Sequence, residues 1–261
     1  MRPTLTVAYS CLADRVGNLR PPASHDDVEY VVCIQGSPAK APDWAQLVVV
    51  EGLGVARSRN AAIDAATGRF LLFCDDDVAI DLDGVRVAIG IIEQSGAALA
   101  LGRGLDPNGD PRKSYPSQVT KLTRFNSARA ATYEMLIDVD QIRSAAVRFD
   151  IRFGAGVPLY LADEYIFVAD MLAAGLTAVS VPEVFGTHPA VSSGDQWGSP
   201  LDAHVRAVAI NRAFGRIAPI ARIAFAAKHA RRLGGWRDVL TFATNDSGPD
   251  DDLPRQRRSP G

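Results

Sequence analysis

Residues 54–77 read GVARSRNAAIDAATGRFLLFCDDD, and this stretch predicts a helix followed directly by a buried strand. Apolar residues recur at helical spacing from Val55 to Ala66, and Gly68 is the residue type that commonly ends helices. The run RFLLFC (69–74) has the length and the apolar composition of a strand that is buried on both faces of a parallel sheet. Three aspartates follow this strand without a break.

Other apolar runs of the same kind surround this stretch in the first two-thirds of the chain. Further strands are expected at residues 5–9, 29–34, 46–50, 97–101, 134–140 and 177–182, and further helices at residues 82–96 and 162–175. Strands that alternate with helices indicate an α/β fold, in which a Rossmann-like, mostly parallel sheet is flanked by helices.

The chain is expected to divide into three regions. Residues 1–195 form the main α/β domain, residues 196–244 form a C-terminal helical extension, and residues 245–261 form a tail. The tail is rich in Asp, Arg, Ser and Pro, a composition that buries too little apolar surface to fold, and it is therefore expected to be disordered.

The helical extension differs from the rest of the chain in its charge. Residues 1–200 carry 17 basic and 24 acidic side chains, whereas residues 201–245 carry 8 basic and 2 acidic ones. An acidic body argues against nucleic acid as a partner, because phosphate binding needs clustered Lys and Arg. The basic segment predicts a peripheral contact with an anionic membrane surface through residues 201–240, and the alternative is a helix that packs on the main domain.

An amphipathic helix is expected within this basic segment, and Pro219 is expected to kink or split it. The predicted apolar stripe consists of Ile210, Phe214, Ile217, Ala221 and Ala224, with Arg212, Arg216 and Arg222 on the other side.

Composition limits the class of protein and its location. The chain has 261 residues, of which 47% are hydrophobic and 22% charged, so it buries a sizeable core and is neither disordered, collagen-like nor a small disulfide scaffold. No run approaches the ~18 consecutive apolar residues of a membrane-spanning helix, and the N-terminus lacks the pattern of an export signal. Three cysteines without a CxxC pair fit buried, reduced thiols. We therefore expect a cytoplasmic protein, with peripheral association at the inner face of the membrane as an option.

Asp75, Asp76 and Asp77 form the sharpest candidate site. They follow a predicted strand of a parallel sheet, and ligands bind at the carboxyl ends of such strands. Alternate residues of an extended chain point the same way, so Asp75 and Asp77 are expected to share a direction. Adjacent carboxylates repel one another, and Mg²⁺ or Mn²⁺ would offset that repulsion. The alternative is a solvated acidic turn at the N-terminus of the next helix.

At these residues the sequence resembles the family 2 glycosyltransferases, which are inverting, nucleotide-sugar-dependent enzymes of the GT-A fold. Residues 54–77 follow the family's order of G-x-x-x-x-R-N, amphipathic helix, glycine, apolar strand and D-x-D. The resemblance implies that residues 1–195 are a GT-A catalytic domain. It also implies contacts with the donor at Arg59, Asn60, Asp75 and Asp76. It further implies a Mn²⁺ or Mg²⁺ site at Asp75 and Asp77.

A second match lies downstream in ADEYIFVADMLAAGLTAVSVPEVFGTHP, residues 162–189. It resembles the family's acidic pair, helix, glycine, strand, proline and closing histidine, although the usual Glu-Asp order is reversed here. The resemblance implies that Glu164 is the base that deprotonates the acceptor hydroxyl, with Asp163 as the alternative. It implies that His188 is a third ligand of the metal or the diphosphate. Without the resemblance, the two acids begin a helix and His188 is an exposed loop residue.

Two strand ends depart from the family pattern. The first strand commonly ends near Pro-x-Tyr-Asn, and this chain has Ala8-Tyr9-Ser10. The second commonly ends in Asp-Asp-x-Ser, and this chain has Gln35 where an acid would contact the nucleobase. Tyr9 and Gln35 are expected to contact the donor. The side-chain amide of Gln35 can both donate and accept hydrogen bonds at a base edge. The departures leave the identity of the nucleobase open.

Residues 102–130 form a long polar stretch punctuated by Gly and Pro. Connections of this length are usually functional, so the stretch is expected to be either a flap that orders over a ligand or a solvated surface loop. Its basic side chains are Arg103, Arg112, Lys113, Lys121, Arg124 and Arg129.

The resemblance implies a metal-dependent hexosyltransferase that moves a sugar from a nucleoside-diphosphate sugar to a hydroxyl of a saccharide or lipid-linked acceptor, in polysaccharide or glycoconjugate synthesis. Two alternatives stay open. One is a non-catalytic nucleotide-sugar-binding protein of the same fold. The other is a haloacid dehalogenase-like phosphatase, with Asp75 as nucleophile and Asp77 as general acid.

Overall fold

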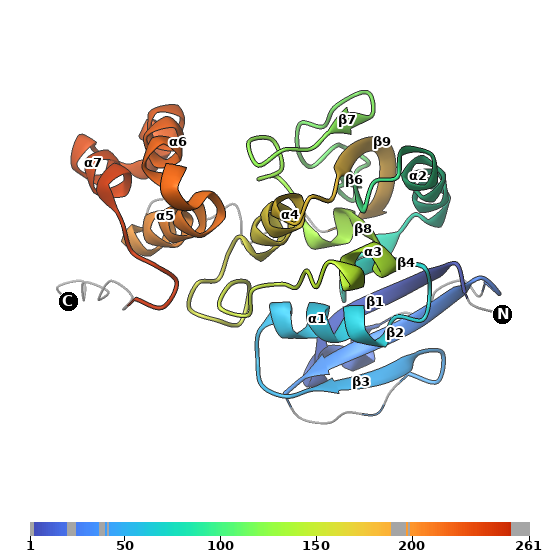
Figure 1. Ribbon diagram of the computed structural model, residues 1–261. Coiled ribbons are helices and arrows are strands. Elements are labelled where there is room, and N and C mark those ends of the chain that lie inside the picture. Colours follow the sequence, from blue (N-terminus) through green and yellow to red (C-terminus); the bar gives the residue numbers. More distant parts are fainter. Residues whose placement is uncertain are drawn as a thin grey trace. The chain divides into compact units, whose positions relative to one another are not determined.

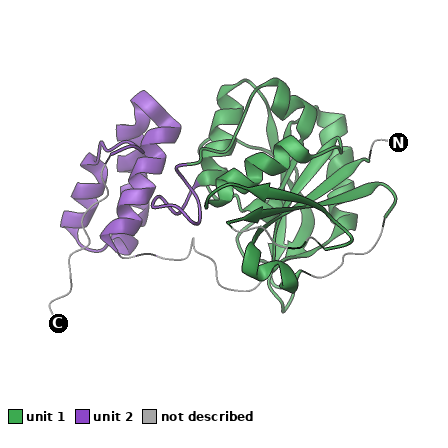
Figure 2. Cartoon of the chain, turned by 90° about the horizontal axis from the view of Figure 1, so that it is seen from below, with its two compact units in different colours: residues 1–151, 163–190 green, residues 152–162, 191–261 purple. Residues whose placement is uncertain are grey.

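The computed structural model describes residues 3–19, 25–36, 40, 42–188, 197 and 199–251 (Figure 1). The chain divides into two compact units, shown in different colours in Figure 2. Unit 1 consists of residues 1–151 and 163–190, and unit 2 consists of residues 152–162 and 191–261. The boundary predicted at residues 195 and 196 lies outside the described residues.

Unit 1 is built on a nine-stranded sheet in the order β3-β2-β1-β4-β8-β6-β9-β5, with β7 paired to β9. The strands are β1 (Leu5–Leu12), β2 (Val28–Gln35), β3 (Gln46–Val50), β4 (Phe70–Asp75), β5 (Ala79–Ile80), β6 (Leu99–Leu105), β7 (Thr120–Lys121), β8 (Met135–Asp138) and β9 (Ala178–Thr187). The seven strands expected from apolar runs are therefore present, and β4 ends at the first of the three aspartates.

Strand direction changes at β8. β3, β2, β1 and β4 run parallel, and β6 is parallel to β9. β8 lies antiparallel between β4 and β6, and the short strands β5 and β7 are antiparallel to β9. The fold is the expected α/β sheet flanked by helices, and the parallel block brings the carboxyl ends of β1, β2 and β4 to one edge.

Helices cover both faces of this sheet. The helices of unit 1 are α1 (Val55–Ala65), α2 (Leu82–Ser95), α3 (Val139–Ser144) and α4 (Asp163–Ala173), with 3-10 turns η1 (Ala13–Asn18) and η2 (Thr132–Glu134). Side chains of α1, α3 and α4 pack with Leu71 and Phe73 on one face. Those of α2 and η1 pack with Phe70, Leu72 and Cys74 on the other. β4 is thus buried on both faces, as its continuous apolar run predicts.

The described part of unit 2 contains three α-helices that pack on one another. They are α5 (Pro200–Phe214), α6 (Ala218–Leu233) and α7 (Trp236–Thr244), with the 3-10 turn η4 (Gly215–Ile217) between the first two. A capping box between Ser199 and Asp202 begins α5. Gly215, with φ 54, ends it, and Pro219 lies in the first turn of α6. The helix expected from residue 210 onward is therefore split, as Pro219 predicts.

The predicted apolar stripe of this region is wrong in phase. Ile210 and Phe214 are buried in unit 2, and Arg222, predicted on the polar side, is only 5% exposed. The exposed isoleucines are Ile217, Ile220 and Ile223. Gly215 and Pro219 cause the error, because the break between α5 and α6 resets the helical phase that the sequence pattern assumed to be continuous.

The start of the predicted tail is held by unit 2. Asn211 Nδ2 donates hydrogen bonds to the carbonyl oxygens of Asn245 and Ser247, at 3.1 and 2.8 Å. Arg152 forms an ion pair with Asp250 at 2.7 Å. Residues 245–251 thus differ from the disorder expected of them, and residues 252–261 lie outside the described residues. In the part of the chain that the structure describes, no helix is both long and apolar enough to span a membrane.

Candidate active site

Strand alternation separates the three aspartates. Asp75 ends β4 in phase with Leu71 and Phe73, and therefore faces the side that α1 and α4 cover. Asp76 turns to the opposite side, where its carboxylate lies 2.8 Å from Arg15 Nη2 and accepts a hydrogen bond from Cys11 Sγ at 3.7 Å. An arginine lies beside Asp75 as well, so the protein itself offsets part of the repulsion that the sequence predicts to require a cation.

Arg59 is the centre of the site on the α1 side. Its side chain is 5% exposed, and it contacts three carboxylates from two distant segments. Nη1 donates to Asp163 and lies 3.3 Å from Glu164 Oε1, and Nη2 lies 3.9 Å from Asp75 Oδ1. One buried cation thus joins the end of β4 to the start of α4.

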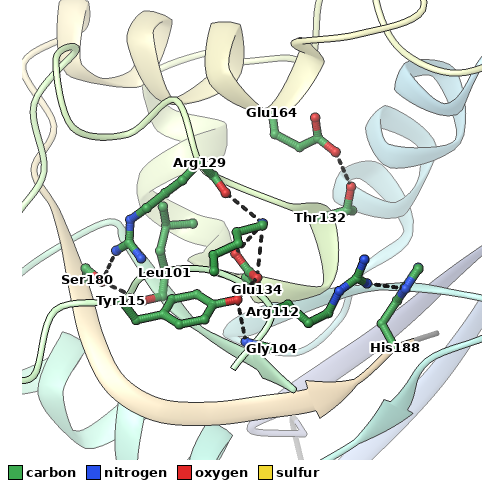
Figure 3. Close-up of polar contacts among 11 residues, drawn as sticks. Leu101, Gly104, Arg112, Tyr115, Arg129, Thr132, Glu134, Glu164, Ser180 and His188 are labelled. Atoms are coloured by element: carbon green, nitrogen blue, oxygen red, sulfur yellow. Dashed lines mark hydrogen bonds and ion pairs between the residues drawn. The ribbon is translucent and has the colours of Figure 1, made fainter. Parts of the chain in front are cut away.

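The two acids of α4 differ in access. The side chain of Asp163 is 4% exposed, whereas that of Glu164 is 19% exposed. Thr132 in η2 donates its hydroxyl proton to Glu164 Oε1 at 2.6 Å (Figure 3). Burial by itself would raise the pKa of Glu164, but Arg59 and the hydrogen bond from Thr132 outweigh it and lower the pKa below its usual range. Glu164 is therefore an ionised carboxylate with one accessible side.

Backbone strain precedes these acids. Ala162 has φ 75, in the left-handed region that residues with a Cβ seldom adopt. Strained residues of this kind cluster at functional sites, where surrounding contacts hold them in place. The contacts of Asp163 and Glu164 with Arg59 are the interactions that fix the chain immediately after Ala162.

Asp77 and His188 form a second part of the site. His188 Nε2 lies 3.5 Å from Asp77 Oδ1, so the last aspartate of the triplet meets the histidine that ends the second sequence motif. The imidazole stacks on Tyr133 with ring centroids 5.3 Å apart. Arg112, from the long polar stretch, donates to His188 Nδ1 (Figure 3).

The contact with Arg112 determines which ring nitrogen of His188 carries the proton. A guanidinium only donates hydrogen bonds, so Nδ1 must accept and the neutral imidazole carries its proton on Nε2. Nε2 is the nitrogen that faces Asp77. A cation bound at Nε2 needs the opposite arrangement, and Arg112 and a cation therefore favour different states of His188.

The polar stretch that carries Arg112 is anchored at its base. Lys113 Nζ lies 3.2 Å from both carboxylate oxygens of Glu134, which is 1% exposed, and donates to the carbonyl of Arg129 at 2.8 Å. Tyr115 donates its hydroxyl proton to Glu134 Oε1 at 2.7 Å (Figure 3). These contacts fix the residues next to Arg112, and whether the stretch moves as a flap stays a prediction.

A divalent cation was predicted at Asp75, Asp77 and His188. Among the described residues, no group of three or more His, Cys, Asp or Glu side chains is arranged to hold a metal ion. The donor chemistry nevertheless fits Mn²⁺ or Mg²⁺ at two of the residues, because Asp77 and His188 offer an oxygen and a nitrogen 3.5 Å apart. Such ions commonly take one or two protein carboxylates and complete their shell with phosphates and water. Burial raises the pKa of Asp75, and Glu164 and Asp77 add to that rise, so negative charge is in excess at this edge.

Three residues predicted to bind the donor make contacts within the fold. The side-chain amide of Asn60 pairs with the backbone of Phe149, donating to its carbonyl at 2.9 Å and accepting from its N–H at 2.8 Å. Gln35 Oε1 accepts from the backbone N–H of Gly54 at 2.8 Å, just before α1. Tyr9 is buried edge-to-face against Trp44, with centroids 5.9 Å apart. A donor contact through these three side chains stays a prediction.

Sequence reasoning missed the supporting residues of the site. Thr132 and Tyr133 lie in a short 3-10 turn between two strands, and no sequence pattern marks such a turn as functional. Arg15 was missed because its partner Asp76 lies far along the chain. Arg112 was identified as one of six basic residues in a polar stretch, and only the tertiary fold distinguishes it from the other five.

Comparison with known proteins agrees with this architecture. The model of the family described as "Glycosyl transferase family 2" matches residues 10–152. The crystal structure of S. aureus TarS 1–349 in complex with UDP is 17% identical, with a TM-score of 0.55 over 87% of this chain and 72% of that chain. The same fragment in complex with UDP-GlcNAc is 14% identical, with a TM-score of 0.56 over 92% and 76%.

A further solved structure, described as that of a mycobacterial protein, is 16% identical, with a TM-score of 0.52 over 81% of this chain and 75% of that chain. At such identities the likeness shows a shared fold, which is that of GT-A glycosyltransferases. No curated protein matches the chain significantly in sequence.

Proposed function

The chain belongs to glycosyl transferase family 2, and from this premise we propose that it transfers a sugar, with inversion, from a nucleoside-diphosphate sugar to an acceptor hydroxyl. The observation that carries the proposal is the convergence of Asp75, Asp163 and Glu164 on Arg59. It brings the two family-like motifs, which are far apart in the sequence, to one edge of the sheet. TarS structures hold UDP and UDP-GlcNAc, and this supports a nucleotide-sugar donor.

Glu164 is the general base of the proposed reaction. Its lowered pKa keeps it ionised near neutral pH, and it is more exposed than Asp163. An ionised carboxylate accepts the proton of the attacking hydroxyl as the bond to the anomeric carbon forms, while the nucleoside diphosphate leaves from the opposite face. Proton transfer of this kind typically contributes ~10²–10⁴-fold to the rate.

Asp163 and Thr132 position this base. Asp163 is almost fully buried and holds Arg59, and Thr132 fixes Glu164 Oε1. Arg59 keeps Glu164 ionised and holds both acids of α4 close to Asp75. A base with fixed orientation accelerates the reaction more than a mobile one, because the entropy of ordering its side chain is already lost when the protein folds.

The opposite end of the site handles the leaving group. Asp77 and His188 are the residues that would hold Mn²⁺ or Mg²⁺, with Asp75 nearby, and when bound the cation supplies positive charge to the departing diphosphate. Arg112 adds a guanidinium of the chain itself beside His188. Guanidinium groups match phosphate oxygens in geometry and charge, so we assign Arg112 to diphosphate binding.

The two alternatives differ in their support. A phosphatase of the haloacid dehalogenase type carries its aspartates after the first strand, whereas Asp75 ends β4 and pairs in register with Ser10 of β1. This alternative does not fit. A non-catalytic nucleotide-sugar-binding protein keeps the same fold and is distinguished by turnover alone. A saccharide or lipid-linked acceptor, and a location at the inner face of a membrane, are further parts of the proposal.

A donor screen tests the proposal. Each of a panel of nucleoside-diphosphate sugars is incubated with the full chain and Mn²⁺, and release of nucleoside diphosphate is measured with and without saccharide acceptors. We expect release from one donor class, and we expect it to disappear in Glu164→Gln while calorimetry still detects donor binding. Glu93→Gln is the matched control, because Glu93 forms an exposed ion pair with Arg69. Binding without turnover in the unaltered chain would favour the non-catalytic alternative.

A further inference from the structure

One face of unit 2 combines exposed isoleucines with basic side chains. On α6 four exposed apolar residues lie on one side of the helix, at positions i, i+3, i+4 and i+7, namely Ile220, Ile223, Ala224 and Ala227. Ile217 of η4 lies just before them. Ile220 is 72% exposed and Ile223 is 59% exposed. We call this stripe, which runs along α6 toward the start of α7, the α6–α7 surface; Trp236 and Leu240 of α7 are exposed as well.

Unit 2 has a core of its own, and the exposed isoleucines lie outside it. The opposite side of α6 is already used, since Ala218, Ala226 and Leu233 are buried in unit 2. Arg222 on that side bonds to Asn211 and to the carbonyl of Ala243, which joins α6 to α5 and α7. The outer stripe is therefore a second apolar face that unit 2 does not need for its own packing. Large exposed apolar groups collected on one surface mark a contact site.

Basic residues flank this stripe. Residues 203–237 contain eight Arg and Lys and no Asp or Glu. Five of the eight are exposed, namely Arg216, Lys228, Arg231, Arg232 and Arg237. The sign of the charge is therefore uniform along η4, α6 and the start of α7, whereas residues 1–200 are net acidic.

We propose that the α6–α7 surface binds an anionic phospholipid membrane. A helix that lies in the membrane interface has an apolar stripe bordered by Lys and Arg, and Trp is enriched at that depth. The exposed isoleucines enter the headgroup region, and the flanking guanidinium and ammonium groups contact lipid phosphates. Anionic headgroups attract each basic residue near the surface, which supplies the charge complementarity.

Two other occupants fit the surface less well. A second copy of the chain, docked through the same face, would bring the exposed arginines of both copies together and would be opposed by like-charge repulsion. A nucleic acid would satisfy the basic groups, but phosphate contacts leave Ile220 and Ile223 without a partner. A lipid surface satisfies both kinds of side chain at once.

Vesicle flotation of the full chain tests this inference. Vesicles of phosphatidylcholine are compared with vesicles that also contain phosphatidylglycerol. We expect flotation with the anionic vesicles, a partition coefficient about tenfold lower with phosphatidylcholine alone, and weakening by salt. The double variant Ile220→Asp with Ile223→Asp is expected to abolish flotation. The control is Val87→Asp, because Val87 is also an exposed apolar residue, at 52%, and lies on α2 in unit 1.

Tryptophan fluorescence provides a second readout. Ile220 is 72% exposed within the stripe, so in an Ile220→Trp variant transfer into the interface should shift the emission to shorter wavelength relative to the unaltered chain. Circular dichroism of each variant checks that unit 2 is folded. No flotation of the folded chain with anionic vesicles would overturn the proposal. Flotation that persists in the double aspartate variant would overturn it as well. So would a dimer, detected by light scattering, that the variant no longer forms, or nucleic-acid binding that the variant loses. The inference deepens the membrane location in the proposed function, and because none of these measurements needs a nucleotide sugar, their outcome is independent of the proposed sugar transfer.

Discussion

Two buried arginines, one in each unit, meet different partners. Arg59 in unit 1 is 4% exposed and lies among the carboxylates of Asp75, Asp163 and Glu164. Arg222 in unit 2 is 5% exposed, and it donates to neutral oxygens, namely the side-chain amide oxygen of Asn211 and the carbonyl of Ala243. Both guanidinium groups are hydrogen-bonded, as a buried charge requires.

The difference separates a structural arginine from one that serves a site. Neutral oxygens are sufficient to hold Arg222 between three helices, and each of them is a backbone or amide group that no pH change alters. Arg59 has three carboxylates for one positive charge, which is more than pairing needs. Burial, together with the neighbouring carboxylates, raises the pKa of Asp75, whereas Arg59 and the hydrogen bond from Thr132 lower the pKa of Glu164 and keep it ionised. Such an arrangement is costly for stability and useful for proton transfer.

The largest expected effect is on turnover, and it concerns the excess carboxylate directly. Glu164→Gln keeps the shape of the side chain and the hydrogen bond to Thr132 but cannot accept a proton. We expect kcat to fall by ~10²–10⁴-fold with little change in donor affinity. Asp163→Asn should lower stability as well as rate, because Asp163 is the buried partner of Arg59. If Glu164→Gln and Asp163→Asn lost the same amount of stability, Glu164 would have a structural role like that of Asp163.

Removal of the two arginines compares the two regions in a single assay. Arg59→Met leaves three carboxylates without their cation and should lower the free energy of unfolding by ~3–5 kcal/mol. Arg222→Met leaves neutral acceptors unpaired and should cost ~1–3 kcal/mol. Arg59→Lys, which retains the charge, should fall between Arg59→Met and the unaltered chain. Urea denaturation measures all of them, and a larger cost for Arg222→Met would contradict the comparison.

The pH dependence sharpens the same contrast. Because the pKa of Glu164 is lowered in the folded state, its ionised form stabilises the fold above the pKa of the unfolded chain, and this stability is lost as the pH falls through the lower, folded value. The acid limb of kcat/KM should accordingly lie below the usual range of a glutamate. Arg59→Met should move this limb upward, and Arg222→Met should leave it in place. Profiles of kcat/KM over acidic pH, recorded for both variants, measure this shift, and an equal shift in Arg222→Met would contradict the contrast.

A smaller effect is expected at the His188 end. Arg112→Gln removes the obligatory donor from His188 Nδ1, so the imidazole can carry its proton there and present Nε2 to a cation. We expect Mn²⁺ to bind roughly tenfold more tightly in calorimetry, and nucleoside diphosphate to bind more weakly. Lys121→Gln, in the same polar stretch but exposed, is the control. Unchanged Mn²⁺ affinity in Arg112→Gln would show that Arg112 and the cation do not compete.

The smallest effect is expected at Asp76. Its partner Arg15 is 47% exposed, and ion pairs with one solvated member contribute ~0–1 kcal/mol. Asp76→Asn should therefore change stability little and leave turnover within a few-fold of the unaltered chain. Strand alternation is the reason, since it turns Asp76 away from Arg59. A loss of activity as large as that of Glu164→Gln would mean that Asp76 contacts the donor, as the resemblance implied.

The elements of the fold could be predicted because each carries its own local pattern. The run before Asp75 is apolar without interruption, and the structure buries β4 on both faces. Gly96 ends α2 in the left-handed conformation, as its position after an amphipathic stretch predicts. The reversed direction of β8 carried no such signal, because a short apolar run does not reveal the orientation of its neighbours.

The site could be predicted as a list of residues but not as an arrangement. The motifs identified Arg59, Asp75, Glu164 and His188, yet nothing in their spacing shows that Arg59 reaches both acids of α4. That contact depends on how α1 and α4 pack on the same face of the sheet. Asn60 stands next to Arg59 in the motif, but the helix turns its side chain to the backbone of Phe149.

The configuration of the transferred sugar tests the central claim most directly. Proton NMR of the glycoside formed from an α-linked nucleoside-diphosphate sugar reports which face of the anomeric carbon was attacked, because the configuration of the new linkage is stable. An ionised Glu164 acting on the acceptor hydroxyl predicts a β-linked product and stoichiometric release of nucleoside diphosphate. An α-linked product, or turnover that survives in Glu164→Gln, would contradict this account.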